Sequence, residues 1–130
     1  MKRLLIADDE EGVRSLVRMT LESQNYMILE ASSCSETMSI ARRDHPNLIL
    51  LDIMMSDGSG IEVCRALKED PSTAEITVVM LTAKAEEADL DAATAAGAAG
   101  YFTKPFSPVA LMARVEEILG TGIYDEYIDH

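Results

Sequence analysis

The sequence predicts an α/β fold, a doubly wound parallel sheet of five strands with helices on both faces. Short apolar segments alternate with segments of helical periodicity along the chain, and several apolar segments lack polar alternation, as strands covered on both faces do. The 130 residues, 48% of them apolar, are enough for one domain with a single core. Right-handed crossovers between successive strands lead us to expect the strand order 2-1-3-4-5.

Five apolar segments are the expected strands. They are Leu4–Ala7, Tyr26–Leu29, Leu48–Leu51, Ile76–Leu81 and Tyr101–Thr103. The first, third and fourth have almost no polar residue, which predicts strands that are buried on both faces.

A helix is expected after each strand, and the first two have clear signals. Four apolar residues recur at helical spacing after the first strand, namely Val13, Leu16, Val17 and Leu21. Ser33 and Glu36 have the spacing of a capping box and begin the second helix. That helix ends at His45-Pro46, because the residue before a proline disfavours helical backbone. His45 has no second histidine or cysteine at ligand spacing, so we do not expect it to bind a metal.

The remaining helices follow the same logic. Ile61, Cys64 and Leu67 predict a third helix, which Asp70-Pro71 ends. The alanine-rich segment Glu86–Ala96 predicts a fourth, with Gly97 suited to the position just after it.

The fifth helix begins at Ser107-Pro108, a cap and first-turn pair. Its apolar side is formed by Leu111, Val115, Ile118 and Leu119. We therefore expect one domain over residues 1–119, followed by a tail, residues 120–130. This tail is either a frayed terminus, a segment that docks on the domain or the start of a linker.

Charge and cysteine content exclude several functions. The chain has 11 basic and 23 acidic residues and a net charge of −12, which makes nucleic acid and membrane surfaces poor partners. The apolar start of the chain is interrupted by Asp8 and Asp9, which argues against a signal peptide or a membrane span. Two cysteines, Cys34 and Cys64, are too few for a disulfide framework. We expect a cytoplasmic protein.

Polar residues collect where the apolar strands end. Asp8 and Asp9 follow the first strand, Asp52 the third, Thr82 the fourth and Lys104 the fifth. In the expected strand order these strand ends lie along one crevice, where open α/β sheets bind their ligands.

The three carboxylates repel one another, so the crevice favours a cation. Oxygen ligands in a small crevice favour Mg²⁺, with Mn²⁺ as the alternative. Acidic residues can instead stabilise a following helix N-terminus, and for Glu10 and Glu11 we expect that simpler role.

Several motifs occur in a fixed order. Leu4–Glu10 carries the acidic pair, Leu50–Met55 an aspartate, Met80–Ala83 a threonine and Lys104–Phe106 a lysine before a proline, with Tyr101 three residues before that lysine. Together they resemble the receiver domains of two-component response regulators over nearly the whole chain. The resemblance implies a flavodoxin-like fold and a phosphorelay function.

The resemblance implies a role for each residue of the crevice. Asp52 would be the phosphoacceptor, which takes a phosphoryl group from a sensor histidine kinase or a phosphotransfer protein. Asp9 and Asp52 would bind Mg²⁺ directly, with the Met54 carbonyl as a third ligand and Asp8 acting through water. This division fits the chemistry, because phosphoryl transfer depends on positioning and charge neutralisation.

The resemblance also implies a switch. Thr82 and Lys104 would contact the phosphoryl group, and Tyr101 would turn inward on phosphorylation. Met54 and Lys84 would form the rim of the site. We further expect Lys104-Pro105 to have a cis peptide bond, which X–Pro bonds adopt at low cost.

One segment departs from the family pattern. Receivers usually have a proline four residues after the phosphoacceptor, where this chain has Ser56 in the sequence Ser-Asp-Gly-Ser-Gly. Two glycines without a proline predict an unusually flexible loop.

The face formed by segments 86–96, 101–103 and 108–119 is where we expect a downstream protein to bind. Receivers of the winged-helix class dimerise there through acidic residues that Ala98-Ala99-Gly100 and Val109-Ala110 lack, and only Arg114 resembles the basic partner. The chain is thus either a stand-alone phospho-switch or a module of a larger regulator or hybrid kinase.

An enzyme is the third alternative, a magnesium-dependent phosphohydrolase with an aspartate nucleophile. Such enzymes place an acid/base aspartate two residues after the nucleophile, where this chain has Met54, which cannot transfer a proton. We therefore expect at most slow loss of the protein's own phosphoryl group.

Overall fold

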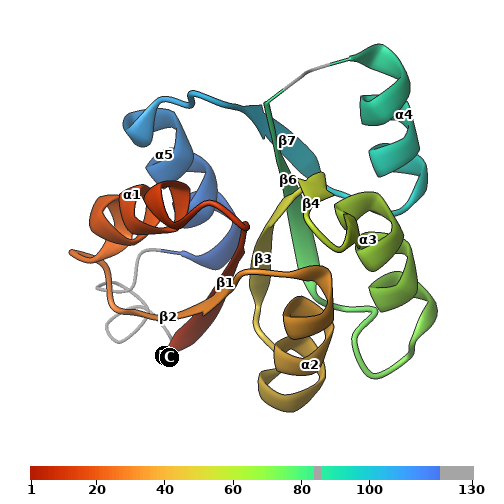
Figure 1. Cartoon of the computed structure of the whole chain (residues 1–130). Helices are drawn as coiled ribbons and strands as arrows, with labels where there is room; N and C mark the ends of the chain where they lie inside the picture. Colours follow the sequence, from red (N-terminus) through yellow and green to blue (C-terminus); the bar gives the residue numbers. More distant parts are fainter. Residues whose placement is uncertain (84–85, 121–130) are drawn as a thin grey trace.

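The computed structural model describes residues 1–83 and 86–120, and the predicted doubly wound sheet is present (Figure 1). Its strands are β1 (Lys2–Ala7), β2 (Tyr26–Ala31), β3 (Leu48–Asp52), β6 (Thr77–Thr82) and β7 (Gly100–Thr103). They are parallel and lie in the order β2-β1-β3-β6-β7. This is the predicted order 2-1-3-4-5, because β6 and β7 are the fourth and fifth strands of the sheet.

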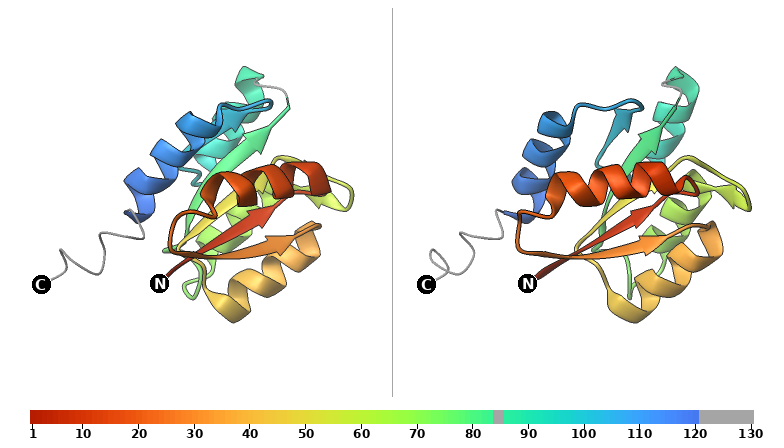
Figure 2. Two further views of the ribbon diagram at one scale, coloured as in Figure 1. Left: turned by 90° about the vertical axis from the view of Figure 1, so that its left-hand side faces the viewer. Right: turned by 60° about the vertical axis from the view of Figure 1, so that its left-hand side comes forward.

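The helices cover both faces of the sheet (Figure 2). They are α1 (Glu11–Leu21), α2 (Cys34–Asp44), α3 (Gly60–Glu69), α4 (Glu87–Ala95) and α5 (Pro108–Leu119). Helices α1 and α5 pack together on one face, and α2, α3 and α4 follow one another on the other. None of the helices within residues 1–83 and 86–120 has the length and apolar character needed to cross a membrane.

Alternate residues of each central strand enter different halves of the core. In β1, Leu4 and Ile6 pack in the cluster under α1 and α5, whereas Leu5 and Ala7 pack in the cluster under α2, α3 and α4. All four are fully buried, because a strand directs successive side chains to opposite faces. This explains the lack of polar alternation in the sequence.

The predicted helix signals are present with one difference. The Ser33 hydroxyl accepts a hydrogen bond from the Glu36 N–H at 3.0 Å, but the Glu36 carboxylate accepts from the N–H of Ser32 rather than from that of Ser33. Gly97 has the left-handed φ of 106° expected after α4. Ser107 caps α5 by accepting from the Ala110 N–H.

Several element boundaries differ from the predictions, including those of β1, which begins at Lys2, and β3, which ends at Asp52. Strand β2 continues to Ala31, which pairs with Ala7; the prediction ended too early because Glu30 is polar, yet its carboxylate is paired with two arginines. Ile76 lies outside β6, since its N–H closes a turn to the Thr73 carbonyl. Strand β7 begins at Gly100, and α4 is one residue shorter at each end.

The segment after Asp52 forms a small hairpin that the sequence did not predict. Strands β4 (Met54–Met55) and β5 (Gly58–Ser59) pair antiparallel. The pairing joins Met54 to Ser59 and Met55 to Gly58, so the segment has backbone order at its base, while the flexibility expected from its glycines stays a prediction. Predictions for Lys84 and for residues 121–130 lie outside the described residues.

Gly60, the first residue of α3, lies directly against the backbone that carries Asp52. A Cβ atom at Gly60 would collide with the Asp52 carbonyl oxygen and crowd the Ile53 Cα. The Gly60 N–H also donates to the Ile53 carbonyl at 2.7 Å. A backbone cannot yield as a flexible side chain does, so this position requires glycine.

We expect Gly60→Ala to lower the free energy of unfolding by about 3 kcal/mol, because the collision displaces buried backbone. Gly12→Ala is the matched control: a Cβ atom there meets nothing within 4 Å, and alanine in a helix should add about 1 kcal/mol. Urea denaturation measures both. Equal unfolding midpoints for Gly60→Ala and the wild type would contradict the close approach.

Candidate functional site

The carboxyl edge of the sheet brings together residues that are far apart in sequence. Asp8 follows β1 and is fully buried, Asp52 ends β3 and is 5% exposed, and Lys104 follows β7. The Lys104 Nζ lies 2.7 Å from the Asp8 Oδ2 and 3.3 Å from the Asp52 Oδ2. The predicted juxtaposition of the acidic residues and the lysine is thus present. The Lys104-Pro105 peptide bond is cis, as expected.

Glu10 joins this group, contrary to the expectation that it would stabilise a helix end. It occupies the N-cap position of α1 but makes no side-chain cap bond, and its carboxylate lies 3.4 Å from the Lys104 Nζ. Its N–H donates to the Asp8 Oδ1 at 2.9 Å, which turns the chain so that its side chain faces the crevice. Its position next to the acidic pair was the sequence signal that could have identified it.

The acidic group has the donor set of a divalent-cation site. Asp8, Asp9, Glu10 and Asp52 each offer a carboxylate oxygen, and these four atoms all lie within 4.8 Å of one another. Oxygen ligands in a compact group fit a hard cation such as Mg²⁺. One ammonium group opposes four carboxylates, so the surplus of negative charge favours a cation.

The environment changes the acidity of the central residues. Burial, followed by the charge of Asp8, raises the pKa of Asp52 to about 6, although Lys104 opposes this shift. Burial would lower the pKa of Lys104, but its hydrogen bond to Asp8 and the charges of Asp52 and Asp8 outweigh burial and raise it. Lys104 is therefore firmly cationic, and the acidic groups hold its charge in place.

The other predicted residues surround the crevice. Thr82 is buried at the end of β6, and its carbonyl accepts from the Lys104 N–H at 2.7 Å. Met54 is 75% exposed, and its N–H donates to the Asp52 Oδ1 at 3.3 Å. Tyr101 on β7 is 50% exposed and belongs to neither core cluster.

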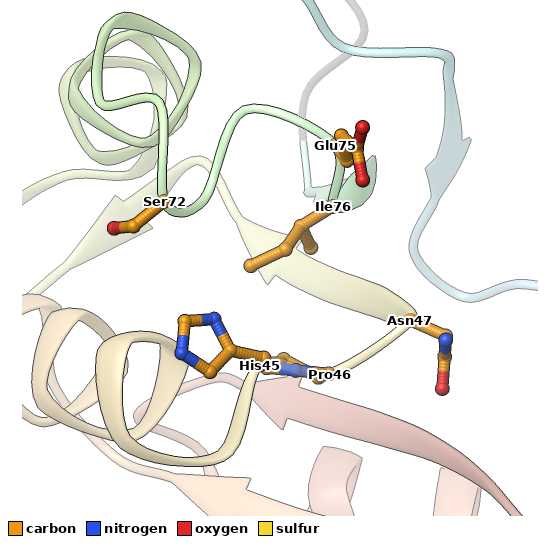
Figure 3. A pocket seen from close by; sticks show the side chains of 6 residues that line it. All are labelled: His45, Pro46, Asn47, Ser72, Glu75 and Ile76. Atoms are coloured by element: carbon orange, nitrogen blue, oxygen red, sulfur yellow. The ribbon is translucent and has the colours of Figure 1, made fainter.

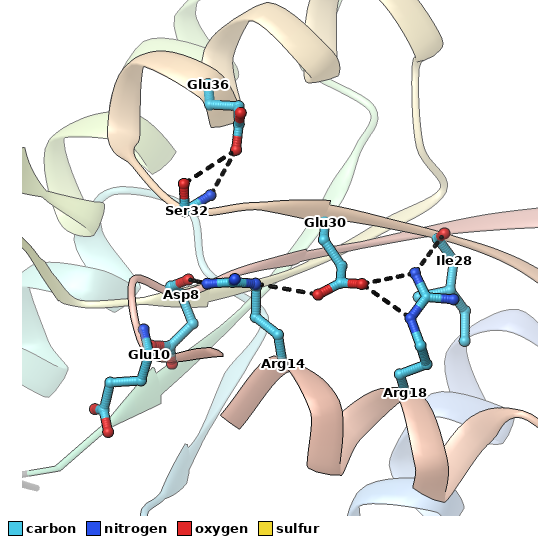
Figure 4. A network of polar contacts seen from close by, with 8 residues as sticks. All are labelled: Asp8, Glu10, Arg14, Arg18, Ile28, Glu30, Ser32 and Glu36. Carbon is cyan, nitrogen blue, oxygen red and sulfur yellow. Dashed lines mark hydrogen bonds and ion pairs between the residues drawn. The ribbon is translucent and has the colours of Figure 1, made fainter. Parts of the chain in front are cut away.

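A network of polar contacts joins α1 to β2 and to the backbone of Asp8, which follows β1 (Figure 4). The Arg14 guanidinium donates to the Asp8 carbonyl at 2.7 Å and to the Glu30 carboxylate at 3.1 Å. Arg18 donates to the other Glu30 oxygen at 2.9 Å and to the Ile28 carbonyl. Arg14 is a residue of the site that no sequence pattern identifies, because nothing in the sequence links it to a backbone carbonyl.

The two cysteines have no sign of chemical reactivity. Cys64 is fully buried, and Cys34 is partly buried near Asp57. Burial and the charge of Asp57 raise the pKa of the Cys34 thiol to about 11, so the nucleophilic thiolate is scarce near neutral pH.

A pocket of about 260 Å³ lies at the opposite edge of the sheet (Figure 3). It is lined by His45, Pro46, Asn47, Ser72, Glu75 and Ile76, which flank the amino ends of β3 and β6. Among residues 1–83 and 86–120, the only group of acidic, histidine or cysteine side chains close enough to hold a metal is the one at the carboxyl edge.

Comparison with known proteins identifies the family that shares this arrangement. The family model described as the response regulator receiver domain matches residues 4–116. The phosphate regulon regulator PhoB of Pseudomonas aeruginosa is 42% identical over 118 residues, and ResD of Bacillus subtilis is 40% identical over 127 residues. These alignments cover 91% and 98% of this chain but 52% of each relative, so the chain spans about half the length of these relatives.

Solved structures agree with the sequence comparison. The Vibrio cholerae chemotaxis protein CheY4 superposes with a TM-score of 0.85 at 26% identity, over 92% of this chain and 99% of that one. The Thermotoga maritima regulator DrrB, an OmpR/PhoB homologue, superposes with a TM-score of 0.82 at 28% identity, over 92% of this chain and 52% of that one.

Proposed function

This chain belongs to the receiver domains of two-component response regulators, and from this premise we propose that Asp52 is its phosphoacceptor. Receiver domains take phosphoryl groups from histidine kinases and are signalling domains rather than enzymes. The observation that carries the assignment is the placement of Asp52, which ends a buried strand with the Lys104 ammonium 3.3 Å from its carboxylate. The proposed receiver domain covers residues 1–119.

The geometry supports Asp52 as the nucleophile. One carboxylate oxygen is oriented by the Met54 N–H and the other by Lys104. One of these two carboxylate oxygens forms the new P–O bond as the P–N bond of the phosphohistidine breaks, and the electron pair of the broken bond returns to the imidazole. The ammonium group then neutralises part of the phosphoryl charge, which favours transfer.

The acidic group is proposed to hold Mg²⁺, with Mn²⁺ as the alternative. Asp9, Asp52 and the Met54 carbonyl would hold the ion directly, and Asp8, which is buried and paired with Lys104, would act through water. Glu10 adds a fourth carboxylate. When bound, the cation supplies positive charge next to the equatorial phosphoryl oxygens.

Thr82, Lys104 and Tyr101 form the proposed switch. Lys104 and Thr82 are already connected through the backbone bond from the Lys104 N–H to the Thr82 carbonyl. A phosphoryl group on Asp52 would bond the Thr82 hydroxyl and draw it inward, so Tyr101, now half-exposed, would turn inward. Lys84 remains the proposed second rim residue beside Met54.

The surface of α4, β7 and α5 is the proposed binding face for a downstream protein. Val109 is 79% and Tyr101 50% exposed there. The Arg114 guanidinium is engaged within its own chain, with Glu117 at 2.9 Å and the Ala99 carbonyl at 3.3 Å. A symmetric dimer joined by crossed ion pairs would need acidic residues at Ala98-Ala99-Gly100 or Val109-Ala110, and this chain has none there. This favours a different protein, rather than a second copy, as the binding partner of the face.

The alternative function, a magnesium-dependent phosphohydrolase, is disfavoured by Met54. The exposed Met54 side chain stands where such an enzyme needs an acid/base group, and a thioether cannot transfer a proton. We therefore propose only slow loss of the phosphoryl group from Asp52.

We expect Asp52→Asn to abolish phosphorylation, because an amide is not a nucleophile for phosphoryl transfer. The protein is incubated with a small phosphodonor and Mg²⁺, and its intact mass is measured. Asp91→Asn on α4 is the matched control and should take up the phosphoryl group like the wild type. A phosphoryl adduct of undiminished yield in Asp52→Asn would refute the assignment.

Mg²⁺ should stabilise the protein, because it relieves the repulsion among the clustered carboxylates. At ten times its Kd, a ligand that binds only the native state adds about 1.4 kcal/mol to the free energy of unfolding. Thermal unfolding with and without millimolar Mg²⁺ measures this gain. Asp9→Ala should lose the gain and Asp91→Ala should keep it; equal midpoints in all samples would mean that the cluster binds no Mg²⁺.

The protein loaded with Mg²⁺ and beryllofluoride, a phosphoryl mimic, should not form the symmetric dimer of the winged-helix class. The reason is that Ala98-Ala99-Gly100 and Val109-Ala110 lack the acidic residues that would pair with Arg114 of a second copy. Sedimentation velocity with and without beryllofluoride compares the two states directly. A tight symmetric dimer that Val109→Asp or Tyr101→Ala dissolves would overturn the proposed heterologous binding face.

A further inference from the structure

Asp57, at the tip of the β4–β5 hairpin, bonds to a helix that lies far from it in sequence. Its Oδ1 accepts from the Cys34 N–H at 2.8 Å, and its Oδ2 accepts from the Ser35 N–H at 3.2 Å. These are the first two N–H groups of α2, which have no partner within the helix. The Ser33 hydroxyl accepts from the third, that of Glu36, so Asp57 and Ser33 share the capping of one helix.

The charge and the acidity of the Asp57 carboxylate favour its hydrogen bonds to α2. A carboxylate at a helix N-terminus is favoured by the helix dipole. The N–H groups of Cys34 and Ser35 hold the pKa of Asp57 below its usual value, so the group stays ionised near neutral pH. Both carboxylate oxygens are engaged, which sets the direction as well as the distance of the contact.

The hairpin that Asp57 holds also carries the Met54 backbone. At the base of the hairpin, the Ile53 N–H donates to the Leu81 carbonyl and the Gly60 N–H to the Ile53 carbonyl. Asp57 ties the tip to α2. The segment is thus attached to β6 at one end and to α2 at the other, while the turn residue Ser56 lacks the stiffness of a proline.

We propose that Asp57 is a positioning residue, which holds the β4–β5 hairpin against α2 and thereby holds the Met54 carbonyl in place for the cation. This inference rests on the proposed function, since it concerns the same cation site. It differs from a plain helix cap in one respect: loss of Asp57 should weaken cation binding by the folded protein, beyond any loss of stability.

The test compares two ways of uncapping α2. Asp57→Ala removes two capping bonds of α2 and, with them, the attachment of the hairpin to α2. Ser33→Ala removes the other capping bond of the same helix and leaves the hairpin attached. Both should lower the urea midpoint. Only Asp57→Ala should weaken Mg²⁺ binding, measured by calorimetric titration, by about tenfold, the lower end of the effect of groups that orient metal ligands.

A second substitution can restore the position of the hairpin without restoring the capping bonds of α2. Ser56 is the first turn residue after β4, a position that suits proline in a β-turn. Asp57→Ala with Ser56→Pro should therefore regain much of the Mg²⁺ affinity while the Cys34 and Ser35 N–H groups stay uncapped. Asp57→Asn, whose amide oxygen still accepts one bond, should fall between the wild type and Asp57→Ala.

Amide hydrogen exchange of residues 54–59 in the Mg²⁺-free protein makes the outcome independent of cation binding. Faster exchange there in Asp57→Ala but not in Ser33→Ala is expected. Unchanged exchange and affinity in Asp57→Ala, or equal effects of Ser33→Ala, would overturn the inference. A wild type that binds no Mg²⁺ would refute the proposed cation site. If the hairpin amides of Asp57→Ala then still exchanged faster, Asp57 would hold the hairpin without any role in cation binding, and the inference as stated would be overturned as well.

Discussion

The site depends on one balance of charge, in which the Lys104 ammonium lies among carboxylates at the carboxyl edge of a parallel sheet. Asp8 is fully buried and lies 2.7 Å from the ammonium, so neither charge is left unpaired in the interior. A buried charge without its partner costs several kcal/mol, roughly 3–5 kcal/mol in measured pairs. The pairing of Lys104 with Asp8 stabilises the arrangement. One ammonium cannot neutralise four carboxylates, so the site retains an attraction for cations.

The backbone around the crevice holds these charges at short range against their repulsion. Arg14 binds the carbonyl of Asp8, and Gly60 permits the close approach of α3 to the Asp52 carbonyl. The β4–β5 hairpin adds a third support on the open side, where Asp57 reaches α2. Each support acts on main-chain atoms, which allows the carboxylates themselves to remain available for a ligand.

The same sheet connects the crevice to a distant surface. Thr82 and Lys104 end neighbouring strands and share a backbone hydrogen bond, and Tyr101 lies three residues before Lys104 on β7. In the proposed switch, a change in charge at Asp52 would reach the α4–β7–α5 face over a few residues of two paired strands. The chain spans about half of the length of its curated relatives.

The sequence by itself determined the five strands of the parallel sheet, the helix that follows each of them and their order. Central strands such as β3 are buried on both faces and therefore leave an uninterrupted apolar pattern, and the helix starts at Ser33 and Ser107 follow from local capping chemistry. Because parallel strands end at one edge, the positions of Asp8, Asp52 and Lys104 were sufficient to predict their meeting. Local backbone preference and strand periodicity act over a few residues, so they can be read from the chain.

Only the tertiary structure decided the contacts that local preference does not encode. Glu30 continues β2 because Arg14 and Arg18 neutralise it, Glu10 faces the crevice rather than capping α1, and Asp57 caps a helix that begins 23 residues earlier in the chain. In each case a polar group finds its partner across space. Such a pairing depends on the packed positions of several elements at once, and no spacing in the sequence specifies it.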